Sequence, residues 1–171
     1  MSNTVENNAK PSLVQQILRF GVVGFTSFFV DFLITLAVAA ACRGAGMHAT
    51  VAAAVGAFFG FVISLIVNYI LSMRFVFERK DDMDRKKEFA IFAILSLIGL
   101  GINEVIILGC MSLIDNVGWI HSFTAWCAGI VGLVKEVSFE GMATAGSKII
   151  ATGIVMVYNF VSRKKFLEKK D

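Results

Sequence analysis

Residues 49–77 read ATVAAAVGAFFGFVISLIVNYILSMRFVF, and no charged residue interrupts them before Arg74. A helix needs about 20 mostly apolar residues to cross the hydrocarbon core of a bilayer, because every backbone polar group must be satisfied within the segment. This stretch is long enough for one crossing. It therefore predicts a transmembrane helix and sets the class of the whole chain.

Three further stretches are comparably long and apolar. The chain has 171 residues, of which 57% are hydrophobic, and a soluble domain of this composition would have too little polar surface to place in water. The apolar stretches, with the first one included, cover about residues 17–42, 49–77, 89–114 and 143–166. The sequence therefore predicts an all-α membrane protein with four transmembrane helices. These form a single domain over residues 1–171, which begins with a cytoplasmic tail over residues 1–15.

Positive charges are concentrated at the N-terminal flank, in the second connection and at the C-terminal end. Of the 16 Lys and Arg residues, only Arg43, Lys135 and Lys148 lie elsewhere. The positive-inside rule places both termini and the second connection in the cytoplasm. A full crossing by the apolar run 117–134 would move the C-terminal charges outside. We therefore predict that residues 115–142 are an outer insertion, either re-entrant or interfacial.

The two halves of the chain share a common pattern. Asp31 on the first predicted helix corresponds to Asn103 on the third, and Asn68 on the second corresponds to Asn159 on the fourth. Each half holds two crossings, so both halves enter the membrane in the same direction. The sequence predicts two parallel two-helix repeats, with a site between them.

Two carboxylates lie at the depth of the bilayer centre. Asp31 follows Arg19 by about 18 Å along the first helix, at a rise of about 1.5 Å per residue, and Glu104 reaches a comparable level on the third. An ionisable side chain there costs at least about 2.5 kcal/mol and normally faces the bundle interior or a wet cavity. We expect a polar seam lined by Asp31, Asn68, Asn103, Glu104 and Asn159. A hydrogen-bonded packing role for the carboxylates is the alternative.

Small residues recur at every fourth position along the second helix and lead to Asn68. Gly56, Gly60 and Ser64 belong to this stripe, and such residues let another helix approach closely. The same face of the fourth helix carries Ser147, Ala151, Val155, Asn159 and Arg163. The stripes predict helix packing, either within the chain or between two copies of it.

Cationic residues lie at the predicted cytoplasmic ends of the helices, namely Arg19, Arg74, Arg163 and Lys165. Arginine is suited to bidentate contact with a phosphate. The phenylalanines that follow Arg74 and Lys165 suit the boundary between headgroups and acyl chains. We predict that these residues bind the phosphate of a lipid. Charge that only sets the topology is the alternative.

This pattern resembles that of the GtrA-like family over about residues 15–167. The matching motifs are Arg19-Phe20-Gly21-x-x-Gly24 with Asp31, Asn68-Tyr69 leading to Arg74-Phe75-Val76-Phe77, and Asn159-Phe160 leading to Lys165-Phe166. The chain departs from the family in two places. Residues 115–146 are longer than the usual third loop, and Glu104 stands beside the expected Asn103.

The resemblance implies that the protein flips a polyprenyl-phosphate-linked sugar across the bacterial cytoplasmic membrane for cell-surface polysaccharide assembly. Its partners would then be that lipid and the membrane lipids, while a membrane glycosyltransferase and a second copy of the chain remain open. No nucleotide-binding motif or metal-ligand spacing occurs in the sequence. We therefore expect no cofactor, no metal, no nucleic-acid partner and no enzyme activity.

Two other functions stay open. A small proton-coupled exporter of cationic compounds would use a carboxylate at mid-membrane, the role that Asp31 or Glu104 would take. It would bind cationic drugs in a pH-dependent way and would not bind prenyl phosphates. A scaffold that recruits a glycosyltransferase, through residues 78–88 or the outer segment, would move no lipid at all.

Overall fold

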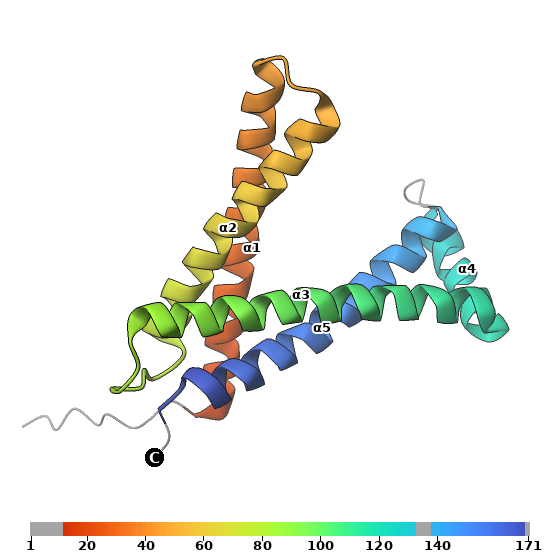
Figure 1. Ribbon diagram of the computed structural model, residues 1–171. Helices are drawn as coiled ribbons and strands as arrows, with labels where there is room; N and C mark the ends of the chain where they lie inside the picture. The colour runs from red at the N-terminus through yellow and green to blue at the C-terminus, as the bar shows by residue number, and fades with distance from the viewer. Residues whose placement is uncertain (1–11, 133–137, 170–171) are drawn as a thin grey trace, which may run out of the picture. The chain divides into compact units, whose positions relative to one another are not determined.

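The computed structural model describes residues 12–132 and 138–169, which form five helices (Figure 1). In chain order these are α1 (Leu13–Gly44), α2 (Ala49–Phe75), α3 (Arg85–Asn116), α4 (Gly118–Gly132) and α5 (Phe139–Leu167). Four of them, α1, α2, α3 and α5, are long and apolar enough to cross a membrane. The prediction of a helical chain with four spans is confirmed. The parallel repeat and the side on which the termini lie stay predictions.

Helices α1, α3 and α5 extend beyond the apolar stretches that predicted them, whereas α2 ends at Phe75, before the predicted end at residue 77. At the start of α1, the Ser12 hydroxyl accepts a hydrogen bond from the Gln15 N–H at 3.3 Å, and the Gln15 side chain accepts one from the Ser12 N–H at 3.2 Å. This capping box lets α1 begin at Leu13 instead of near residue 17. At α5, the Ser138 hydroxyl accepts from the Gly141 N–H at 3.1 Å. That helix begins before residue 143, so the predicted bounds are too short at both places.

Helix α4 occupies the middle of the outer segment predicted over residues 115–142. Its 15 residues have a length of about 22 Å, which is less than the roughly 30 Å of a hydrocarbon core. A helix of this length does not cross a membrane by itself. A re-entrant or interfacial position of the segment stays a prediction, and its residues 133–137 lie outside the described part of the chain.

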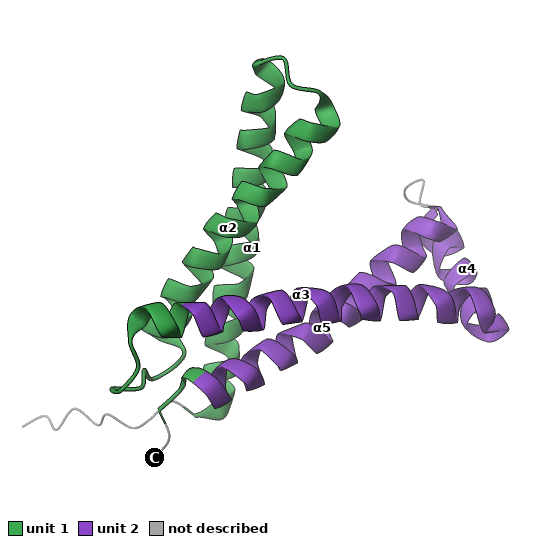
Figure 2. Ribbon diagram, in the orientation of Figure 1, with its two compact units in different colours: residues 1–89, 167–171 green, residues 90–166 purple. Residues whose placement is uncertain are grey.

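The chain divides into two compact units (Figure 2). Unit 1 contains residues 1–89 and 167–171, and unit 2 contains residues 90–166. The chain therefore passes from one unit to the other after the first turn of α3 and again at the end of α5.

In unit 1, α1 and α2 pack through the small residues of α2. Ala52, Gly56 and Gly60 are buried on this face. A Cβ added at Gly56 would lie 2.6 Å from the Thr35 carbonyl oxygen, and one added at Gly60 would lie 2.8 Å from the Asp31 carbonyl oxygen. The two backbones therefore approach more closely than any larger residue allows.

We expect Gly60→Ala to lower the free energy of unfolding by about 1–3 kcal/mol, because the added methyl overpacks against the α1 backbone. The matched control is Gly24→Ala on α1, where an added Cβ meets nothing within 4 Å. There the usual helix preference for alanine should leave stability unchanged or raise it by up to about 1 kcal/mol. Unfolding of the purified protein in detergent measures both variants. Equal stabilities would contradict the close approach at Gly60.

Candidate functional site

Unit 2 holds a buried cation at the end of α5. The Arg163 residue is 2% exposed, and its guanidinium carbon lies 3.8 Å from the centroid of the Phe92 ring on α3. One guanidinium nitrogen donates a hydrogen bond to the Ser96 hydroxyl at 2.9 Å. Phe92 is itself fully buried. A cation–π contact and a neutral hydrogen bond thus hold the charge between α3 and α5.

An amide lies one helical turn before this cation. The backbone of Gly99 on α3 faces Asn159 on α5, and a Cβ added at Gly99 would lie 3.1 Å from the Asn159 Oδ1. This Oδ1 is buried and has no hydrogen-bond partner among the described residues. A buried acceptor left in that condition costs roughly 1–3 kcal/mol. It therefore offers a favourable place for a donor from a bound molecule.

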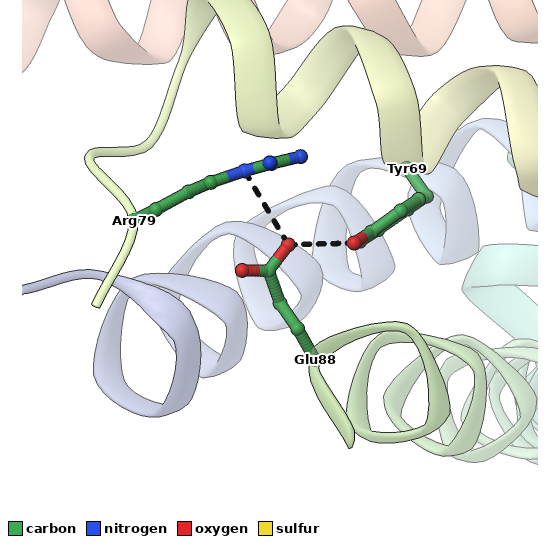
Figure 3. A network of polar contacts seen from close by, with 3 residues as sticks. All are labelled: Tyr69, Arg79 and Glu88. Atoms are coloured by element: carbon green, nitrogen blue, oxygen red, sulfur yellow. Dashed lines mark hydrogen bonds and ion pairs between the residues drawn. The ribbon is translucent and has the colours of Figure 1, made fainter. Parts of the chain in front are cut away.

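Unit 1 contains a second buried charge, which sequence reasoning missed. Glu88 in the first turn of α3 is 1% exposed, and its Oε1 accepts a hydrogen bond from the Tyr69 hydroxyl at 2.7 Å. The Arg79 Nε lies 3.5 Å from the same oxygen (Figure 3). The loop after α2 is thereby tied to both α2 and α3. Glu88 ends a run of exposed charged residues, so nothing in its sequence surroundings distinguishes it from them.

The residues after α5 are also joined to this loop in unit 1. The Lys169 N–H donates to the Glu78 carbonyl at 2.9 Å, and Glu168 forms an antiparallel bridge with Arg79. The Gln16 side chain donates both to the Val76 carbonyl, at 3.0 Å, and to the Glu168 carboxylate.

The exposed Lys169 ammonium is paired with the Asp81 carboxylate, and this hydrogen bond raises the pKa of Lys169. The pair is solvent-exposed on both sides. A pair of this kind adds little to stability. The backbone hydrogen bond of Lys169 is therefore the more informative contact at this end of the chain.

The predicted phosphate-binding cations differ in their surroundings. In unit 1, Arg19 is exposed and donates to the Phe75 carbonyl at 3.4 Å, and the exposed Arg74 lies 5.5 Å from the Phe75 ring. In unit 2, Lys165 is exposed and lies 5.8 Å from the Phe166 ring, whereas Arg163 is buried. Of the four, Arg163 alone is buried. A single ring of all four cations stays a prediction.

The predicted seam residues are shared between the units. In unit 1, Asp31 is half-buried against Gly60, and the half-buried Asn68 accepts from the Ser72 hydroxyl at 3.0 Å. In unit 2, Asn159 is half-buried, while Asn103 donates to the exposed Glu104 at 3.4 Å. The half-buried Ser64 bonds to the Phe61 carbonyl of its own helix at 3.0 Å. A seam that joins both sets stays a prediction.

Comparison with known proteins places the chain in a family. No curated protein and no solved structure shows significant similarity to it. The profile of the GtrA/DPMS transmembrane domain, however, matches residues 19–167, which is most of the chain. Within that range lie α2, α3 and α5 in full and most of α1, the four helices suited to cross a membrane. The chain is therefore a multi-pass membrane protein and belongs to the GtrA/DPMS transmembrane domain family.

Proposed function

We propose that the protein moves a polyprenyl-phosphate-linked sugar across the bacterial cytoplasmic membrane, with both of its own termini in the cytoplasm. The observation that carries the proposal is the buried Arg163 in the last turns of α5. A cation that is buried between two helices costs several kcal/mol to desolvate, which favours a functional role over a merely topological one. Membership of the GtrA/DPMS family supports a glycosyl lipid as that substrate.

The surroundings of Arg163 suit a phosphate. Ser96 and Phe92 orient the guanidinium between α3 and α5. A guanidinium has five N–H donors in a planar fork that matches two phosphate oxygens at once. Its charge is also permanent at every physiological pH. An anionic lipid head that approached the end of α5 would therefore be held by charge-assisted hydrogen bonds.

The amide of Asn159 suits the sugar. Its buried Oδ1 lacks a hydrogen-bond partner among the described residues and lies one turn deeper in α5 than Arg163. A sugar hydroxyl is a donor that would satisfy this oxygen. Arg163 would thus bind the phosphate, and Asn159 would accept a hydrogen bond from the sugar. The prenyl tail would stay among the lipid chains.

The exposed cations of the helix ends would collect the lipid from the inner leaflet. Arg74 in unit 1 and Lys165 in unit 2 are exposed, and each lies against a phenylalanine that follows it. A basic residue close to an anionic membrane surface contributes about 1 kcal/mol to lipid attraction. These two residues would therefore concentrate the substrate, whereas Arg163 would bind it.

The test is transbilayer movement of a polyprenyl-phosphate sugar in proteoliposomes that contain the purified protein. The wild type should accelerate this movement over protein-free liposomes. The double variant Arg74→Gln/Lys165→Gln loses two charges at about 1 kcal/mol each, so it should lower the rate about thirtyfold at low salt. The difference should be smaller at high salt, because screening weakens lipid attraction in the wild type too. A wild type that never accelerates the movement, yet binds a glycosyltransferase, would overturn the proposal in favour of a scaffold. Transport of cationic drugs in its place would favour an exporter.

A further inference from the structure

Unit 2 contains a cavity that the proposed phosphate and sugar contacts do not use. Its volume is about 350 Å³, and it is a half-open pocket lined by the end of α3, by α4 and by the start of α5. Its lining includes Cys110, Ile114, Phe123, Cys127, Gly146 and Ile150. The volume is about twice that of an engineered ~150 Å³ cavity that binds benzene, so roughly a dozen carbon atoms would fit.

Among the described residues that line the cavity, only the two thiols have a polar group available to a ligand. The two hydroxyls of its lining are already engaged within their own helices: Thr124 donates to the Ile120 carbonyl at 2.9 Å and Ser147 to the Ala143 carbonyl at 2.8 Å. A buried water needs two to four polar partners, whereas a cavity of apolar walls stays dry or takes an apolar molecule. The fitting occupant is therefore a hydrocarbon chain.

The distance from the cavity to Arg163 determines how long a lipid tail must be to reach the cavity. Ile150 at the cavity precedes Arg163 by about 20 Å along α5, and Ser96 precedes Cys110 by about 20 Å along α3, at about 1.5 Å per residue. One leaflet is about 15 Å thick in its hydrocarbon part, half of the core. A lipid whose phosphate is at Arg163 reaches the cavity only if its tail is longer than one leaflet. A long polyprenyl chain meets this condition, and a short farnesyl chain does not.

We infer that the cavity between α3, α4 and α5 binds a distal part of the polyprenyl tail of the lipid whose phosphate is held at Arg163. This inference rests on the proposed function and adds a selection for tail length to it. Arg163 would bind the phosphate of the lipid headgroup, and the cavity would bind long isoprenoid chains more tightly than short ones. Helix α4, which is absent from the four predicted spans, would thereby gain a role as one wall of the tail site.

Two glycines of α5 provide a matched test. Gly146 lines the cavity and Gly153 does not, and an added Cβ meets nothing within 4 Å at either position. Replacement of either glycine should preserve the helix, because glycine is the weaker helix former. Gly146→Phe would fill the cavity, and Gly153→Phe would add the same side chain outside it.

Binding is measured in nanodiscs with undecaprenyl phosphate and farnesyl phosphate at equal mole fractions in the bilayer. The wild type should bind undecaprenyl phosphate at least tenfold more tightly than farnesyl phosphate. Gly146→Phe should remove this difference by weakening undecaprenyl phosphate alone, and Gly153→Phe should retain it. If Gly146→Phe and the wild type bind undecaprenyl phosphate equally well, the tail site is wrong. This result is also expected if acyl chains of the bulk lipid fill the cavity.

Arg163→Gln separates this failure from failure of the proposed function. If Arg163→Gln weakens both lipids and Gly146→Phe weakens neither, the tail site is wrong and the phosphate site stands. If the wild type binds neither lipid, both the proposed function and the tail site are wrong.

The native thiols supply a second readout that does not depend on a filled cavity. A variant that keeps Cys127 alone should react more slowly with a hydrophobic maleimide when undecaprenyl phosphate is added, and farnesyl phosphate should not protect it. A variant that keeps only Cys42 is the control, since Cys42 lies on α1 in unit 1 and does not line the cavity. Equal protection of both thiols, or of neither, would also contradict the tail site.

Discussion

Replacement of Arg163 by glutamine is expected to lower transport of a polyprenyl-phosphate sugar by about a hundredfold or more while the protein stays folded. Glutamine keeps a polar amide at this position, but it is shorter, carries no charge and cannot hold two phosphate oxygens in the same way. Each hydrogen bond to a charged group is worth about 1.5–3 kcal/mol, so the loss of a bidentate contact amounts to about 3 kcal/mol or more. Initial rates in proteoliposomes with equal amounts of protein measure the effect.

The stability of the same variant separates a functional from a structural role. A buried charge is costly to desolvate, so its replacement by a neutral side chain of similar size should leave the unfolding temperature unchanged or raise it. Arg163→Lys keeps the charge but loses the planar fork, and should transport at an intermediate rate. Lys148→Gln removes an exposed charge from the other end of α5 and should behave as wild type. Transport by Arg163→Gln at the wild-type rate would remove Arg163 from the mechanism.

The spans could be predicted from the sequence because transfer into hydrocarbon is the largest energy in such a chain. The apolar runs identified α1, α2, α3 and α5, since a run of that length has no other stable place. Their ends could not be found in this way. Helix ends depend on hydrogen bonds to caps such as Ser12, and polar residues extend a helix as readily as apolar ones outside the bilayer. The first turn of α3, which contains Lys86 and Lys87, illustrates this.

The candidate site was accessible from the sequence in part. The spacing of four residues through Ser147, Ala151 and Arg163 marks one helix face, and all three residues are buried in unit 2. Hydropathy and charge counts alone could not separate Arg163 from its neighbours Lys164 and Lys165. The separation follows from helical geometry, because successive residues point about 100° apart. The helix face was therefore a stronger signal than the number of charges.

The cavity next to α4 shows the opposite case. Its walls come from three helices, and the apolar residues that line it have the same composition as those that face lipid. Only the packing of α4 against α3 and α5 distinguishes them. A sequence pattern shows which residues are apolar. It does not show where the packing of those residues leaves a cavity.

Reversal of the charge at position 88 is expected to be the most destabilising of the proposed substitutions. Glu88→Lys would place an ammonium in a site that is 1% exposed, where the Arg79 guanidinium already approaches the same point. The side chain of Arg79 is 36% exposed and can turn toward solvent, so the repulsion is partly relieved. The desolvation of the new cation is not relieved, and it costs several kcal/mol by itself. We therefore expect a loss of about 4 kcal/mol or more, measured by denaturant unfolding in detergent.

Two comparisons decide whether the cause is burial of the charge. Glu88→Gln keeps an acceptor for the Tyr69 hydroxyl and should lose only about 1–2 kcal/mol, and Tyr69→Phe should then add little further loss because the two residues share one hydrogen bond. Asp82→Lys makes the same change of charge at an exposed position of the same loop and should stay within about 0.5 kcal/mol of the wild type. If Glu88→Lys were as stable as Asp82→Lys, the network could not be what joins the loop to α2 and α3. A large loss confined to Glu88 would mean that one buried carboxylate, hidden among exposed charges in the sequence, holds the first turn of α3 in unit 1.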